Sequence, residues 1–458
     1  MPTEYFERRE RALLGDRFDA LYAAPQETAA RGVTVSALRA APEQFAAQAD
    51  FPVEPSPFCK AGFVVQDPAF KPGRHPYHHA GVFYSQEPSA SSAAPLLGVR
   101  PGMRVLDTCA APGGKSSQLA AALGGQGLLV SNEFVAARAE VLRSNLERMG
   151  VPNAVVLNED TGRIAAALPE FFDRVLVDAP CSGEGMFRKD RDARGEWSEG
   201  NVKQCAARQD EILREAWRAL RPGGTLVYST CTFNRDEDEG ALERMAAWAG
   251  DEIAESEETA VEDAWGIVCG RVGAFRTFRF YPHRTCGEGF FAAVARKSFD
   301  AGGRVRAPKA RRTVFAAVDR KTAGELARWV RNPGGMHFAA VADTCYAWYA
   351  AQADAVRTLS EALPVIYSGV ALGQVFKGVL KPDPALAFFD GMNRGALPAA
   401  ELDDEETLRF LRRQDIAAGG LAEGMNLVCS RGRALGFAKR IGARVNNLYP
   451  SSLRIIKQ

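Results

Sequence analysis

Between residues 99 and 298 the sequence alternates short apolar segments with stretches of helical periodicity, and this alternation constrains the fold more than any other feature. Short apolar runs bounded by turn residues are typical of buried strands, and strands separated by helices form parallel sheets. The pattern therefore predicts a doubly wound α/β sheet. The expected strands are Arg104–Asp107, Gly127–Asn132, Ala154–Asn158, Asp173–Asp178, Thr225–Ser229, Phe275–Tyr281 and Gly289–Arg296.

Helical periodicity fills the gaps between the first five strands, and the last two are separated by the turn-rich sequence PHRTCGEG. We therefore expect a hairpin there, which adds an antiparallel edge to the sheet. An acidic stretch, Asp251–Asp263, is interpreted as a solvated surface insertion. The expected helices are Lys115–Leu123, Val135–Met149, Ile164–Leu168 and Cys205–Leu220.

The sequences on either side of this sheet follow other patterns. Residues 1–57 predict short helices with proline-broken connections, and residues 58–92 predict irregular structure with short strands. Residues 297–312 are Gly-rich and basic, which is typical of a linker or of a phosphate-contacting segment. The predicted division is an N-terminal extension at 1–75, a sheet domain at 76–298, a basic linker with a small module at 299–370, and a last module at 371–458.

Small and polar residues follow the first three expected strands at the point where each one ends. Asp107 precedes CAAPGGK, whose two glycines permit a tight turn into a helix with free N–H groups at its start. Asn132–Glu133 end the second strand, where a carboxylate can hydrogen-bond a ribose diol, and Glu159–Asp160 follow the third, within reach of an adenine. Since the carboxyl ends of parallel strands meet at one edge, a crevice for a nucleotide-like ligand is predicted there.

Two cysteines follow the next two strands and are brought to the same edge. VLVDAPCSG carries Asp178 and Cys181, and TLVYSTCTF carries Cys231. A thiolate is a strong nucleophile that can add to the electrophilic C6 of a pyrimidine ring, which prepares C5 to take a methyl group from a sulfonium donor. Methylation of an exocyclic amine is disfavoured, because Asp178 is followed by Ala-Pro-Cys and not by Pro-Pro and an aromatic residue.

The motifs CAAPGGK, DAPCSG and STCTF, in this order at successive strand ends, resemble those of the NOL1/NOP2/Sun family of RNA cytosine-C5 methyltransferases. The resemblance covers residues 55–298 and includes PHRTCGEGFF. It implies a Rossmann-like S-adenosylmethionine methyltransferase sheet with an N-terminal extension that positions RNA. The tail, with GVALGQVFKG and LGFAKRIGARVNNLYP, resembles that of the bacterial 16S rRNA branch called RsmF, which implies a C-terminal mixed α/β PUA-like RNA-binding module.

The resemblance also implies roles for individual residues. Asp178 would hydrogen-bond the cytosine at N3, Cys231 would be the nucleophile, and Cys181 would help to remove the C5 proton and release the enzyme. Cys109 and Cys205 would not be catalytic. The residues implied in S-adenosylmethionine binding are Cys109, Ala110, Ala111, Pro112, Gly113, Gly114, Lys115, Glu133 at the ribose, Asp160 at the adenine, and Asp178.

Charge is distributed unevenly along the chain. Residues 301–458 carry an excess of basic residues and residues 1–300 an excess of acidic ones, although the net charge is only +1. A basic surface on an acidic body indicates contact with nucleic acid. The expected RNA contacts are Arg188, Lys189, Arg431, Arg433, Lys439, Arg440 and Arg444, and the strands expected in the last module are Gly373–Leu380, Asn426–Val428, Leu435–Ala438 and Leu453–Ile456.

Several classes of protein are excluded by what the sequence lacks. It has no apolar run long enough to span a membrane and no signal peptide, so a cytoplasmic protein is expected, with a monomer as the default. Nine cysteines without CxxC pairs argue against a disulfide framework, and no metal site is expected. The predicted substrate is 16S rRNA in a small ribosomal subunit or its precursor. The alternatives are the same reaction on tRNA, and a non-catalytic RNA-binding ribosome assembly factor.

Overall fold

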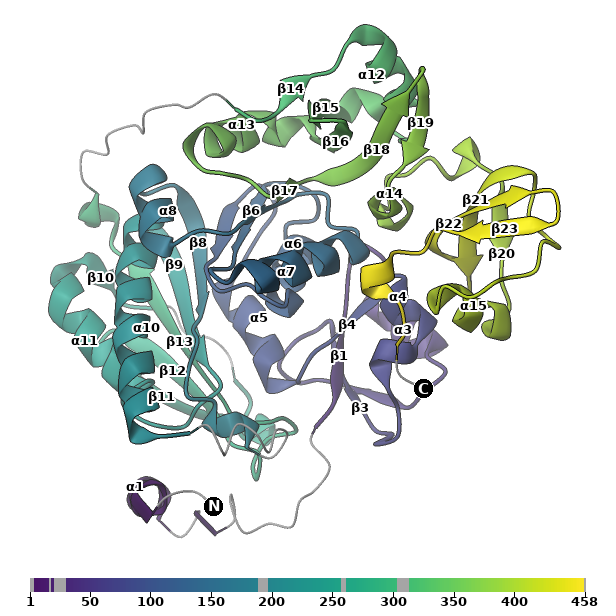
Figure 1. Ribbon diagram of the computed structural model, residues 1–458. Helices are drawn as coiled ribbons and strands as arrows, with labels where there is room; N and C mark the ends of the chain where they lie inside the picture. Colours follow the sequence, from purple (N-terminus) through teal and green to yellow (C-terminus); the bar gives the residue numbers. More distant parts are fainter. Residues whose placement is uncertain are drawn as a thin grey trace.

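A computed structural model of the chain describes residues 4–15, 18–19, 30–187, 197–256, 261–302 and 313–456 (Figure 1). A large central sheet is built in the order β11-β12-β13-β9-β8-β5-β6-β7-β17, with β10 (Ile253–Ala254) paired to β13. Its strands are β5 (Arg104–Asp107), β6 (Leu128–Asn132), β7 (Ala154–Leu157), β8 (Phe172–Asp178), β9 (Leu220–Thr230), β11 (Val268–Val272), β12 (Phe275–Phe280), β13 (Phe290–Lys297) and β17 (Tyr367–Ser368).

The five strands from β9 to β7 are parallel, and β12 and β13 form the expected antiparallel hairpin beside β9. The chain order reverses between β5 and β8, because β6 and β7 follow β5 on one side while β8 and β9 lie on the other. Ligands of open α/β sheets bind at such a reversal, beyond the carboxyl ends of the strands. The two strands that end there carry Asp107 and Asp178.

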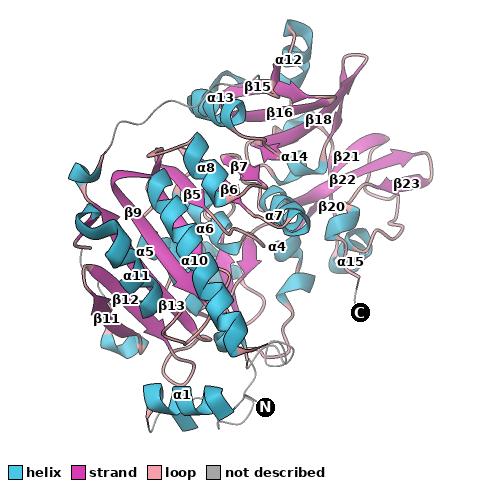
Figure 2. Cartoon of the chain, turned by 60° about the vertical axis from the view of Figure 1, so that its left-hand side comes forward, coloured by secondary structure: helices cyan, strands magenta, loops and turns pink. Residues whose placement is uncertain are grey.

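Helices cover both faces of the parallel part, which explains why its strands are apolar on both sides. One face packs against α5 (Ala93–Leu97), α6 (Gly114–Ala122) and α7 (Ala136–Arg148). The other packs against α8 (Thr161–Ala167), α10 (Glu199–Ala219) and α11 (Glu239–Ala249), which Figure 2 shows in front of the strands. The four expected helices are present, and α11 is an element that the sequence pattern did not reveal.

The N-terminal part is more sheet-like than expected. After α1 (Glu4–Leu14) the chain forms a four-stranded antiparallel sheet in the order β2-β3-β1-β4, accompanied by α3 (Pro42–Gln48) and α4 (Pro76–His79). The prediction of short helices in residues 1–57 agrees with α1 and α3 but missed β1 and β2, and the short buried GVTV segment pairs on both sides as a strand. The strands are β1 (Gly32–Val35), β2 (Val53–Pro55), β3 (Gly62–Val65) and β4 (Phe83–Ser85).

The C-terminal third contains two further sheets. The first, in the order β14-β15-β16-β18-β19, consists of β14 (Ala316–Ala317), β15 (Met336–Val341), β16 (Thr344–Tyr349), β18 (Val370–Phe376) and β19 (Val379–Pro382). The second, in the order β20-β21-β22-β23, consists of β20 (Ala399–Glu401), β21 (Gly424–Ser430), β22 (Arg433–Ile441) and β23 (Arg444–Asn447). Their helices are α12 (Arg320–Ala327), α13 (Ala353–Ala362), α14 (Pro384–Phe388) and α15 (Asp404–Leu411).

Two details of this third bear on the sequence predictions. The strand expected at Leu453–Ile456 is wrong, because a short 3-10 turn at Ser451–Leu453 is followed there by irregular chain. The predicted boundary at residue 370 coincides with the start of β18, and the domain division as a whole stays a prediction. The C-terminal part is tied to the central sheet, since β17 pairs antiparallel with β7 at its edge.

Candidate active site

A cavity of about 170 Å³ lies at the carboxyl edge of β5 and β8, where the chain order reverses. One wall is the loop between β5 and α6, and the opposite wall comes from the N-terminal part of the chain, at β4 and the residues after it. Six of the predicted cofactor residues from the loop, together with Asp178, line the cavity. The residues that line the cavity include Tyr84, Gln86, Glu87, Asp107, Cys109, Ala110, Ala111, Pro112, Gly114, Lys115 and Asp178.

The two glycines of the loop are required by its geometry. Gly113 caps the N-terminus of α6 with a φ of 115°, a conformation that residues with a side chain rarely adopt. A Cβ on Gly114 would approach a ring carbon of Tyr84 to 3.1 Å. The backbone therefore favours glycine at position 113, and glycine at position 114 leaves room for the Tyr84 ring of β4.

Glu133 and Asp160 lie outside the lining of this cavity. Glu133 is buried after β6, accepts a hydrogen bond from the Val135 backbone N–H and lies 3.4 Å from Arg138. Asp160 caps α8, since its Oδ1 accepts from the backbone N–H groups of Gly162 and Arg163. The predicted ribose and adenine contacts of these two residues stay predictions.

Asp178 connects the cavity to the cysteines. Its two carboxylate oxygens accept hydrogen bonds from the Lys115 Nζ and the Ser229 Oγ, both at 2.7 Å. Burial alone would lower the pKa of Lys115, but the adjacent Asp178 carboxylate outweighs it and the pKa is raised. Lys115 is therefore a fixed cation at the centre of the site.

Cys181 and Cys231 lie side by side beyond Asp178, with 3.3 Å between their sulfur atoms. A hydrogen bond from the Cys181 thiol lowers the pKa of Cys231, against the effect of burial, and the Lys115 cation acts in the same direction. The same interaction raises the pKa of Cys181 well above its usual range. The pair thus favours a thiolate on Cys231 and a thiol on Cys181.

The other two cysteines of this region have no comparable setting. Burial raises the pKa of Cys109 in the loop to about 12, and that of Cys205 on α10 to about 11. Both are therefore held as thiols, consistent with the expectation that neither is catalytic.

A buried polar network behind the cysteines was not predicted. Glu237 accepts hydrogen bonds from the Ser182 backbone N–H, the Asn234 Nδ2 and the Gln209 Nε2, at 3.0, 2.6 and 2.8 Å. The Gln209 side chain also donates to the Pro180 carbonyl oxygen. This network links the loop that carries Cys181 to the loop that follows Cys231, and its only trace in the sequence is the acidic run after STCTF.

A second buried carboxylate, Glu184, joins the N-terminal helix to the same loops. Glu184 accepts from the Arg9 guanidinium at 2.6 Å, from the Trp197 indole N–H at 2.9 Å and from the Phe233 backbone N–H at 3.2 Å. The ring of Phe6 packs edge-on against Trp197. Helix α1 is therefore fastened directly behind the two cysteines.

The predicted RNA contacts stay predictions, and the structure places those of the last module in different surroundings. Arg188 and Lys189 lie outside the described residues. Arg431 forms an ion pair with Asp50, at 2.5 Å, which joins the last module to the N-terminal part, and a second ion pair with Asp404 of α15 in its own module. Arg433 and Arg440 donate to backbone carbonyl oxygens of Arg39 and Leu421, while Lys439 and Arg444 are exposed on β22 and β23.

A curated relative matches almost the whole chain. This chain is 34% identical over 453 residues to the ribosomal RNA small subunit methyltransferase F of Klebsiella pneumoniae strain 342, covering 95% of this chain and 92% of the relative. The chain belongs to the ribosomal RNA small subunit methyltransferase F family. The same protein of Vibrio vulnificus strain YJ016 is 39% identical over 292 residues, a match that spans only 61% of that relative's length.

Three family descriptions match successive parts of this member of the methyltransferase F family. They are 16S rRNA methyltransferase RsmB/F at residues 94–296, the N-terminal domain of RsmF at 1–88, and the RsmF PUA domain at 398–455. A crystal structure of a methyltransferase homologue from Pyrococcus horikoshii superimposes with a TM-score of 0.55 at 27% identity, covering 64% of this chain and 95% of that one. The family resemblance and the fold class predicted from the sequence are thereby confirmed.

Membrane-spanning helices and metal-binding clusters are both absent from the described residues. No helix in this part of the chain is long and apolar enough to cross a membrane. No group of His, Cys, Asp and Glu side chains there could hold a metal ion.

Proposed function

We propose that this protein transfers the methyl group of S-adenosylmethionine to C5 of cytosine in small-subunit ribosomal RNA. The observation that carries the proposal is the pair of sulfur atoms 3.3 Å apart, next to the Lys115–Asp178 ion pair, at the strand edge where the chain order reverses. Membership of the methyltransferase F family supports ribosomal RNA over tRNA as the substrate. Such a substrate would place the protein in the cytoplasm.

The residues of the cavity fit S-adenosylmethionine. The Oδ1 of Asp107 is buried and has no hydrogen-bond partner among the described residues, so it can accept from a cationic amino group. The loop 109–115 offers the N-terminus of α6 to a carboxylate. When bound, the cofactor supplies an electrophilic methyl group.

The cysteine pair supplies the remaining steps. The Cys231 thiolate attacks C6 of the cytosine, the C5–C6 electron pair becomes available at C5, and Asp178 holds N3 by a hydrogen bond. After methylation the C5 proton passes to Cys181, the electrons of that C–H bond re-form the C5–C6 double bond, and the bond between C6 and the Cys231 sulfur breaks. Once Cys231 is a neutral thioether, it no longer opposes ionisation of Cys181, so the pKa of Cys181 falls, the thiol releases its proton to solvent, and the resulting Cys181 thiolate can accept the C5 proton.

The reaction is tested by incubating the protein with methyl-labelled S-adenosylmethionine and, separately, naked 16S rRNA, intact small subunits and tRNA. We expect label as 5-methylcytidine in one of the ribosomal substrates, detected by mass spectrometry of the digested RNA. Label in tRNA alone would favour the tRNA alternative. RNA binding without label in any substrate would favour an assembly factor.

The buried carboxylate in the cavity predicts a pH dependence of cofactor binding. Burial raises the pKa of Asp107 to about 7, against the Ser116 hydrogen bond and the Lys115 cation, while Asp178 adds to the rise. A cationic ligand stabilises the ionised form, so the affinity for S-adenosylmethionine should increase as the pH rises through about 7. Calorimetric titrations from about pH 5.5 to 7.5 measure this, and Asp107→Asn should bind more weakly with no such increase. An unchanged pH profile in that variant would assign the effect to another group.

A further inference from the structure

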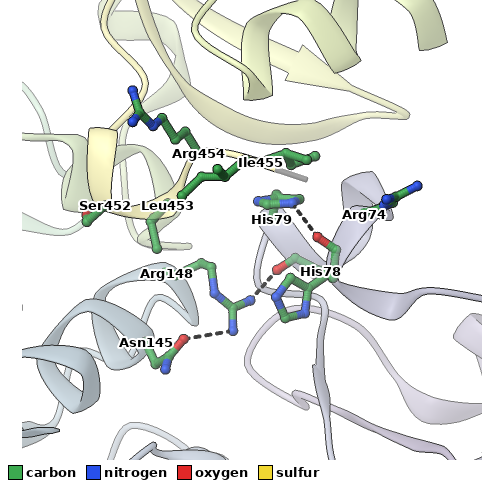
Figure 3. Close-up of a pocket in the computed structure, with 11 residues that line it drawn as sticks. Arg74, His78, His79, Asn145, Arg148, Ser452, Leu453, Arg454 and Ile455 are labelled. Atoms are coloured by element: carbon green, nitrogen blue, oxygen red, sulfur yellow. Dashed lines mark hydrogen bonds between the residues drawn. The ribbon is translucent and has the colours of Figure 1, made fainter. Parts of the chain in front are cut away.

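A second and larger cavity, of about 370 Å³, lies where three parts of the chain meet (Figure 3). Its walls are the turn and helix that run from Gly73 to His79, the C-terminal end of α7, and the chain end at residues 452–456. It shares no lining residue with the cavity around Lys115. Its volume falls in the range of about 300–1,000 Å³ that is typical of ligand sites.

The most unusual residue of this cavity is Arg148, the last residue of α7. Its side chain is buried and donates hydrogen bonds to the His78 carbonyl oxygen and to the Asn145 Oδ1, as the dashed lines in Figure 3 show. Its guanidinium lies 5.6 Å from the centre of the Tyr84 ring, no carboxylate in the described part of the chain forms an ion pair with it, and burial lowers its pKa. A buried cation without a counter-ion is unfavourable unless an anion completes the site.

The two histidines of the cavity do not add to its charge at neutral pH. His79 is held between the Tyr449 hydroxyl at 2.8 Å and the Gly73 carbonyl oxygen at 3.0 Å, and burial lowers its pKa to about 4. Burial also lowers the pKa of His78 well below its usual range, and its Nδ1 is buried without a hydrogen-bond partner among the described residues. Charge in this cavity therefore comes from arginine.

Two further arginines stand at the rim. Arg74 and Arg454 lie on opposite sides of the cavity in Figure 3, and none of its lining residues is acidic. Leu453 and Ile455 provide apolar surface between them. In Figure 3 the side chains of Arg74 and Arg454 point outward, so they would turn inward to reach a ligand held by Arg148. An arginine beside an apolar wall, with two more at the rim, suits a phosphate with a sugar attached, because arginine binds phosphate oxygens in pairs.

The cavity is also connected to the cofactor loop. Asn145, whose Oδ1 accepts from Arg148, donates from its Nδ2 to the Pro112 carbonyl oxygen at 2.8 Å. We propose that this junction cavity binds a backbone phosphate of the RNA substrate, with Arg148 as the buried cation and Arg74 and Arg454 closing on the phosphate from the rim. The proposal rests on the proposed function in so far as RNA is the substrate.

The test replaces the two rim arginines, because they reach solvent and their loss leaves the fold intact. RNA affinity is measured against salt concentration by fluorescence anisotropy for the full chain, for Arg74→Gln/Arg454→Gln, and for the control Arg320→Gln/Lys321→Gln on α12. We expect the rim variant to bind RNA about tenfold more weakly, with a salt slope smaller by about 0.7–0.9 for one lost phosphate contact. The control should keep the wild-type slope, and all three proteins should bind S-adenosylmethionine equally.

A second arm uses inorganic phosphate alone and follows the melting temperature. Phosphate should stabilise the wild type and the control but not the rim variant. If phosphate stabilises the wild type but the rim variant keeps the wild-type RNA salt slope, the cavity is a site for a free anion and the proposal is overturned. The proposal is also overturned if the rim variant and the wild type do not differ in either arm. If the wild type transfers no methyl group but the salt slopes still differ, the proposed reaction fails and the phosphate site stands.

Discussion

Cys231→Ala is expected to abolish methyl transfer, whereas Cys181→Ala is expected to stop the reaction one step later with RNA attached to the protein. The sulfur atoms are 3.3 Å apart, and their hydrogen bond makes Cys231 the more acidic thiol. Removing the nucleophile should lower the rate of methyl transfer by at least about 10³-fold. Without Cys181 the C5 proton has no base, so the bond between Cys231 and the methylated ring persists.

The two outcomes are separated by a denaturing gel after incubation with RNA and S-adenosylmethionine. A shifted, nuclease-sensitive band should form with Cys181→Ala and be missing with Cys231→Ala and with the double variant. The matched control is Cys205→Ala, which replaces a nearby thiol whose pKa burial raises to about 11 and should keep wild-type activity. An adduct on Cys181 in the Cys231→Ala variant would exchange the two roles.

Arg9→Met is expected to destabilise the protein by about 3 kcal/mol, because it leaves Glu184 as a buried carboxylate without its cation. The Glu184 side chain has no exposed surface, and the Arg9 guanidinium lies 2.6 Å from it. Urea unfolding measures the loss. Arg11→Met, two positions along α1, loses an exposed ion pair with Asp19 and a contact with the Phe18 ring, and should change the free energy of unfolding by no more than about 1 kcal/mol.

A double-mutant cycle distinguishes the buried charge from lost packing. Glu184→Gln combined with Arg9→Met should recover part of the stability, since the amide removes the buried charge and its oxygen can still accept from the Trp197 indole N–H. Additive losses in the double variant would show that the two side chains do not interact. The Arg9→Met variant should also lose activity, because Glu184 accepts a hydrogen bond from Phe233, which is two residues from Cys231.

The central sheet was predictable because its signals are local. Each parallel strand is a short apolar run, and the residues that follow it, such as Asp107 and Asp178, lie at the carboxyl edge whatever the rest of the chain does. The short strand β1 was not recognised, since four residues that begin with a glycine carry little periodic signal and its partners are β3 and β4 further along the chain.

The parts of the site that could not be predicted depend on contacts distant in sequence. The Arg431 guanidinium meets Asp50 across 381 positions, so a basic cluster that suggests RNA contact contains an arginine that joins two parts of the protein. The polar network behind the cysteines likewise depends on burial: Asn234 donates hydrogen bonds to both Glu184 and Glu237, and all three side chains are buried. On the sequence alone these are charged and polar residues near two cysteines, and their burial decides which of them hold the loops of Cys181 and Cys231.

The pairing of β17 with β7 limits where the chain can be truncated without exposing the central sheet. An exposed edge strand offers a row of unpaired N–H and C=O groups to other chains and promotes aggregation. Here the backbone of Ile366 and Gly369, on either side of β17, donates to Val156 and Ala154, and Tyr367 is buried against the sheet. A fragment that ends at the linker would lose this cover and expose an apolar edge. The methyltransferase sheet is therefore protected against self-association by the module that follows it.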